Sequence, residues 1–70
     1  MRVNAKLPRV LGKKIQKKRH EMRLNQEELA EKIGISRAYM GYIEQGRNTP
    51  SLEVLEKLAR VLKVSIRDLF

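Results

Sequence analysis

The chain has 70 residues, the size of one small domain, and it has no cysteine, which excludes disulfides and thiolate metal sites and suits a reducing cytoplasm. Sixteen lysines and arginines against eight aspartates and glutamates give a net charge of +8, which predicts a polyanionic partner, either nucleic acid or an anionic membrane surface. No apolar run approaches the roughly 20 residues that cross a bilayer.

The basic excess lies at the start of the sequence. Residues 1–23 hold nine basic side chains and one acid, whereas residues 24–70 hold seven of each sign, so the first 23 residues account for the whole net charge. We expect residues 1–7 to form a basic N-terminal arm and residues 8–70 to form a single domain. A helix whose charge merely aids solubility is the alternative explanation.

The first helix is expected from Pro8, which a first helical turn tolerates, to about Met22. Leu11, Ile15 and Met22 recur at spacings of four and seven residues, the period of one helix face. Arg19 falls beside this apolar seam, which is an unusual position for a charge.

The second helix is expected over roughly residues 26–33. Asn25 followed by Glu28 is the pattern of a capping box, and Gly34 supplies the left-handed residue that ends a helix. The residues predicted to face inward are Leu29, Ala30 and Ile33.

Ser36 caps the third helix, which runs to about Gln45 and stops at Gly46. Only residues 34–36 join it to the helix before. So short a connection predicts a sharp corner, the geometry of a helix-turn-helix, in which the second helix lies in the major groove of DNA.

A fourth helix begins after Thr49 or Ser51, either of which suits an N-cap. Its predicted inward residues are Leu52, Leu55, Leu58, Ala59 and Leu62. Ser65 with Asp68 three residues later predicts a short fifth helix. The expected fold is therefore all-α, a compact five-helix domain without strands.

The third helix divides into two faces at 100° per residue. The inward side carries Ser36, Tyr39, Met40 and Ile43, with Glu44 at its edge. The outward side carries Arg37, Ala38, Gly41, Tyr42 and Gln45. The outward side chains suit contacts with base edges or phosphates, whereas a merely solvated face usually carries lysine and glutamate.

Several short stretches follow one another in a specific order from residue 11 to residue 70: Leu11-Gly12-Lys13-Lys14-Ile15 with Arg19, Asn25-Gln26-Glu27-Glu28-Leu29-Ala30, Gly34-Ile35-Ser36, Ile43-Glu44-Gln45-Gly46, and Pro50-Ser51-Leu52 with Leu55, Leu58-Ala59 and Leu62. Together they resemble the Cro/repressor type of helix-turn-helix domain, also called the xenobiotic-response-element family, which is lambda-repressor-like. The resemblance implies five helices, with the third as the recognition helix.

The resemblance also implies a DNA-binding set. Gln26 is expected to contact a phosphate, and Tyr39 and the loop after the third helix are expected to meet the DNA backbone. Arg37, Ala38 and Tyr42 are expected to face bases. The full set is Gln26, Ser36, Arg37, Ala38, Tyr39, Tyr42, Gln45, Arg47 and Asn48.

The chemistry of the base-facing residues is specific. Arg37 can fork onto guanine, Ala38 can touch a thymine methyl, and Tyr42 can form one hydrogen bond or pack apolarly. The alternative for Arg37 is an exposed surface charge, and the alternative for Tyr39 is a place at the edge of the core.

The resemblance further implies a structural ion pair between Arg19 and Glu44, which would tie the first helix to the recognition helix. Gly41 in mid-helix is unfavourable relative to alanine, so a close approach of the second helix or of the DNA backbone is expected there.

An enzyme is not expected, because the chain has one histidine, no cysteine, no glycine-rich phosphate loop and no acid pair framed by a pocket. No cofactor or metal is expected either.

The expected function is that of a sequence-specific DNA-binding transcriptional regulator, with repression the favoured mode. The expected partner is double-stranded DNA with a two-fold symmetric operator. A homodimer is expected through the fifth helix, because Ile66 and Phe70 have no obvious place in so small a core.

Two other functions compete with this one. A protein-interaction module of the same fold, such as an antitoxin or a bridging factor, would not need the outward face of the third helix arranged for a duplex. A basic amphipathic membrane anchor is opposed by a first helix that lacks Trp and Phe and whose apolar seam serves the core.

Overall fold

Four α-helices and a 3-10 turn follow one another along the part of the chain described by the computed structural model, residues 6–70, with side chains from residue 8 onward. The elements are α1 (Lys6–Glu21), α2 (Gln26–Ile33), α3 (Arg37–Glu44), α4 (Leu52–Leu62) and η1 (Ile66–Leu69). The all-α prediction is confirmed for the described residues. Residues 1–5 of the expected basic arm lie outside them, and Lys6 and Leu7 belong to α1.

The prediction of a fifth helix was wrong in the type of element, because Ile66–Leu69 is a 3-10 turn of four residues. The backbone N–H and the hydroxyl of Ser65 donate to Asp68 Oδ2 at 3.1 and 3.0 Å, so the pairing suggested by the sequence is present. Four residues are too few to stabilise an α-helical nucleus, and the tighter i→i+3 bond is used instead. The two Ser65 donors hold the pKa of the exposed Asp68 carboxyl below its usual value.

Side chains from all five elements form one buried core. Its members are Leu11, Ile15, Leu29, Ala30, Ile33, Met40, Ile43, Leu55, Leu58, Ala59, Leu62 and Leu69. Leu52 was expected in this core but is 64% exposed. It is the first residue of α4, at the margin of the apolar stripe, and the buried part of the helix begins one turn later at Leu55.

Side chains cap the starts of α2, α3 and α4 as the sequence predicts. Asn25 Oδ1 accepts from the Glu28 amide at 2.7 Å, and Glu28 Oε1 accepts from the Asn25 amide at 2.8 Å. Ser51, rather than Thr49, caps α4 by accepting from the Val54 amide at 3.2 Å. Each cap satisfies an amide that the helix itself leaves unpaired.

All four helices end in the same backbone motif. A left-handed residue follows the last turn, and the next amide donates back to a carbonyl five residues earlier, as in a Schellman motif. The left-handed residues are Arg23, Gly34, Gly46 and Lys63, with φ of 59°, 78°, 77° and 60°. Two helices therefore end at a residue other than glycine.

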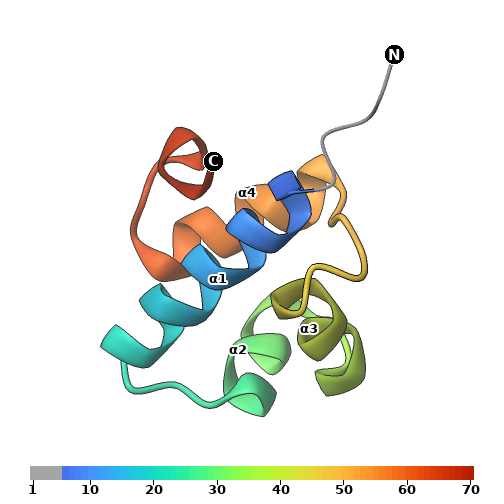
Figure 1. Cartoon of the computed structure of the whole chain (residues 1–70). Helices are drawn as coiled ribbons and strands as arrows, with labels where there is room; N and C mark the ends of the chain where they lie inside the picture. The colour runs from blue at the N-terminus through green and yellow to red at the C-terminus, as the bar shows by residue number, and fades with distance from the viewer. Residues whose placement is uncertain (1–5) are drawn as a thin grey trace.

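The helix α1 packs against α3 on one side and against η1 on the other, with α4 beside it (Figure 1). The contact with α3 is close because residue 12 is glycine. A Cβ there would lie 2.5 Å from the Ile43 carbonyl oxygen and nearer still to that of Glu44. This junction fixes the position of α3 against the rest of the domain.

Candidate nucleic-acid interface

The corner between α2 and α3 is built from three residues. Gly34 is left-handed, Ile35 is half-buried and packs against the core, and Ser36 caps α3 by accepting from the Tyr39 amide at 3.0 Å. The two helices pack closely together, and Figure 1 shows them on the side of α1 away from the C-terminal turn. The corner predicted from the short connection is present.

The outward face of α3 lies in solvent. Its exposed side chains are Arg37, Ala38, Tyr42 and Gln45. No side chain of this face other than that of Tyr42, 40% exposed, is a large apolar group. The opposite face, with Met40 and Ile43 fully buried, supplies the packing, so α3 is held by one face and free on the other.

Gly41 is buried, contrary to its expected place on the outward face. It lies where α2 crosses α3, beside the amide of Gln26. A Cβ on Gly41 would be 3.7 Å from Gln26 Oε1, which is ordinary van der Waals contact. The close approach expected at this glycine therefore involves α2, but it leaves room for a methyl group.

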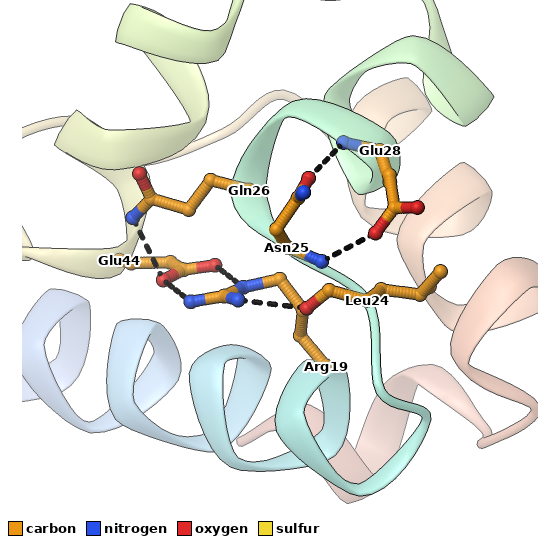
Figure 2. A network of polar contacts seen from close by, with 6 residues as sticks. All are labelled: Arg19, Leu24, Asn25, Gln26, Glu28 and Glu44. Atoms are coloured by element: carbon orange, nitrogen blue, oxygen red, sulfur yellow. Dashed lines mark hydrogen bonds and ion pairs between the residues drawn. The ribbon is translucent and has the colours of Figure 1, made fainter.

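A buried ion pair joins α1 to α3 (Figure 2). Arg19 Nε donates to Glu44 Oε2 at 2.7 Å, and Arg19 Nη2 donates to Glu44 Oε1 at 2.9 Å. The residues are 5% and 7% exposed, respectively. Arg19 Nη1 also donates to the carbonyl of Leu24 at 2.8 Å. A fork-to-fork arrangement of this kind fixes the geometry of both partners.

Gln26 extends the ion pair onto α2. Its Nε2 donates to Glu44 Oε1 at 3.1 Å, and the residue is half-buried at the first position of α2 (Figure 2). The side-chain amide nitrogen of glutamine carries two hydrogens, so one N–H of Nε2 remains free to donate besides the bond to Glu44. The hydrogen bond to the buried Glu44 therefore fixes the orientation of the Gln26 side chain.

Tyr39 and the loop residues differ in exposure. Tyr39 is half-buried and packs against the core, which matches the alternative place at the core edge. Arg47 and Asn48, just after α3, are exposed. The Arg47 guanidinium carbon lies 4.7 Å from the centroid of the Tyr42 ring. Sequence reasoning missed this stack, although the helix stop at Gly46 was a usable signal for it.

Exposed basic side chains continue from this end of α3 along α1. Arg9, Lys13 and Lys17 are spaced one helical turn apart, and all three are exposed. The backbone of Arg9 lies against Gly46, since a Cβ on that glycine would be 2.9 Å from Arg9 Cα. A positively charged strip therefore begins beside the end of α3.

Other chemistry is sparse in the described part of the chain. Residues 6–70 contain no group of three histidine, aspartate or glutamate side chains placed to hold a metal ion. Within the same range, no helix combines the length and apolar character that crossing a membrane requires.

A family model described as helix-turn-helix matches residues 15–69. The chain is 41% identical over 56 residues to the immunity repressor of Bacillus phage phi105, matching 80% of this chain and 39% of the repressor.

Two solved structures are similar in fold. The restriction-modification controller protein C.AhdI from Aeromonas hydrophila has a TM-score of 0.85 and 35% identity, covering 90% of this chain and 96% of that one. SinR, a master regulator for biofilm formation crystallised in complex with DNA, has a TM-score of 0.79 and 38% identity, covering 84% of this chain and 95% of that one.

Proposed function

Since the chain belongs to the helix-turn-helix family of DNA-binding transcription regulators, which are not enzymes, we propose that α3 lies in the major groove of an operator and reads its bases. The observation that carries this proposal is the division of α3 into two faces. Its packing is complete without Arg37, Ala38 and Tyr42, and these exposed side chains are free to meet base edges.

The other residues of the set hold the duplex in place. Gln26 stands at the N-terminus of α2, where backbone amides and the helix dipole favour a phosphate, and its bond to Glu44 leaves a donor for that contact. Gln45 shares the exposed face of α3, Ser36 caps the start of that helix, and Arg47 and Asn48 follow its end; these four residues are exposed, and Tyr39 is half-buried. Arg9, Lys13 and Lys17 add positive charge next to the end of α3.

Selection of bound sequences from a random duplex library tests the proposal, with the described domain and its N-terminal residues together. The expected result is one preferred half-site. The logarithm of the affinity should fall linearly with the logarithm of the salt concentration, with a slope of about −0.9 for each phosphate neutralised. A library that yields no preferred sequence would overturn the proposal and favour a protein-interaction module.

We propose that two copies pair with each other through their C-terminal turns and that the dimer binds a two-fold symmetric operator. Leu69 of this turn is fully buried and Phe70, the next residue, is 51% exposed, whereas Ile66, four residues before Phe70, is half-buried against the core. An exposed phenylalanine next to a buried core residue supports an apolar contact at this end. The half-sites would then lie about 34 Å apart, one turn of the duplex.

Repression is the proposed mode of action, in line with the phage immunity repressor that the chain resembles. A regulator of this kind reaches its operator in the cytoplasm, the location that a chain without cysteine suits.

A further inference from the structure

The end of α3 brings Tyr42 and Arg47 together through the backbone. Gly46, with a φ of 77°, turns the chain back on the helix. The Gly46 amide donates to the Ile43 carbonyl at 3.1 Å, and the Arg47 amide donates to the Tyr42 carbonyl at 2.9 Å. These are the two bonds of a Schellman motif, in which Tyr42 and Arg47 are the residues whose side chains meet.

In such motifs an apolar contact frequently joins these two positions. Here a guanidinium lies 4.7 Å from the centre of the Tyr42 ring, well within the range of a cation–π contact. A planar guanidinium can stack on an aromatic face, which a lysine ammonium does not reproduce. The type of residue at position 47 therefore matters as well as its charge.

The stack is held from both ends. Gly46 sits against the backbone of Arg9, so the turn that carries Arg47 is fixed to α1. Tyr42 belongs to α3, whose other face is buried in the core. One face of the ring is covered by Arg47, which leaves the hydroxyl and the ring edge to meet a partner.

We propose that Arg47 is a positioning residue for Tyr42, so that the base preference opposite Tyr42 depends on the guanidinium of Arg47. The inference rests on the proposed function, because it assigns Arg47 a part in reading sequence. It differs from the role that the family resemblance implies for Arg47, a contact with the DNA backbone.

Arg47→Lys separates the two roles, because it keeps the charge and removes the planar group. Affinities would be measured for the selected operator and for each of its single-base variants. We expect Arg47→Lys to lose about two- to fivefold of discrimination at the position where Tyr42→Ala also loses it, because an ammonium still attracts the ring but cannot stack flat on it as the guanidinium does. The salt dependence should not change.

The control is Arg60→Lys, an exposed arginine on α4, which should keep the full base preference. In a Tyr42→Ala background, Arg47→Lys should cause no further loss of discrimination. If Arg47→Lys keeps all discrimination while Arg47→Ala weakens every duplex equally, Arg47 is a phosphate contact and the inference is wrong.

A measurement without DNA distinguishes this inference from the proposed function. In the free protein, NMR resonances of the Arg47 side chain should be shifted by the Tyr42 ring, with the shift kept in Tyr42→Phe and lost in Tyr42→Leu. Absence of the shift in the wild type would overturn the inference even if the operator is bound with full preference. If the Tyr42 ring shifts the Arg47 resonances as expected but the protein selects no DNA sequence, the proposed function is overturned instead.

Discussion

Arg19 and Glu44 form a doubly hydrogen-bonded ion pair in the interior, although 25 residues separate them in the sequence. Removing two charges from water costs most of what their attraction returns, so such a pair adds little net stability. Removing one partner is strongly destabilising, because the charge of the other partner remains buried without compensation. The pair therefore acts mainly by fixing where α3 lies against α1.

Arg19→Met should lower the free energy of unfolding by about 3–5 kcal/mol, because Glu44 is left buried with only the Gln26 amide as a partner. A chain of this size has about that much stability in total, so the variant should be largely unfolded. Urea titration followed by circular dichroism measures the effect. Arg19→Met combined with Glu44→Met should recover much of the loss.

The exposed pair between Lys57 and Glu53, 3.7 Å apart, provides the control for this prediction. Lys57→Met should change the free energy of unfolding by less than about 1 kcal/mol, as for surface ion pairs in general. Equal effects of Arg19→Met and Lys57→Met would contradict a buried pair.

Gly12 and Gly41 give a matched pair of alanine substitutions with opposite expected signs. Gly12→Ala places a methyl group against two backbone carbonyl oxygens and should destabilise by about 1–3 kcal/mol. Gly41→Ala meets only ordinary contacts with Gln26 and should stabilise by about 0.5–1 kcal/mol. Thermal unfolding of the two variants beside the wild type tests both signs, and a stabilising Gly12→Ala would exclude the close α1–α3 contact.

Lys63→Gly should stabilise the domain by about 1 kcal/mol. Lys63 ends α4 in a left-handed conformation, which is unfavourable for any residue with a Cβ atom and is accessible to glycine without this penalty. Lys63→Ala is the control, since it removes the charge and keeps the strain. An equal gain from both substitutions would show that charge, rather than the conformation of the backbone, was responsible. Melting temperatures at two salt concentrations separate these causes.

Arg37→Ala should cost about 1–3 kcal/mol of binding on the selected operator and flatten the preference at one base-pair position. Gln26→Ala should weaken all duplexes by a similar factor and leave the preferred sequence unchanged, because a phosphate contact carries no sequence information. Binding to a panel of single-base variants measures both. The reverse pattern would mean that α2, not α3, enters the groove.

Phe70→Glu should reduce self-association without changing the fold, because Phe70 is half-exposed while the neighbouring Leu69 fills the core. Sedimentation equilibrium with and without a two-half-site duplex measures the association. The substitution should weaken binding to the paired site more than to a single half-site. Unchanged association would place the dimer contact on another surface.

Much of the fold could be predicted because its signals are local. The capping residues Asn25, Ser36 and Ser51 mark three helix starts, and Gly34 and Gly46 mark two helix ends. Polar caps and left-handed glycines act within a few residues of their own position, so a pattern read along the chain captures them.

The parts that sequence reasoning missed depend on distant contacts or on length. Leu52 has the spacing of a core residue but lies at the margin of the apolar stripe in the first turn of α4. The tight contact at Gly12 and the burial of Gly41 depend on which helix crosses each of them, and the period of one helix does not contain that information. The pairing of Ser65 with Asp68 predicted a helix start, but it is equally compatible with the four-residue 3-10 turn that the structure has.

The Schellman turn at the end of α3 also bears on how related regulators diverge. Positions 37 and 38 are exposed, so exchanging their side chains leaves the core as it is, and under the proposed mode of binding a lineage can change its operator there at little cost to folding. Position 42 is linked to position 47 by the stack of the Arg47 guanidinium on the Tyr42 ring and by the backbone bond between the two residues. Among relatives we therefore expect residues 42 and 47 to covary, while residues 37 and 38 vary independently.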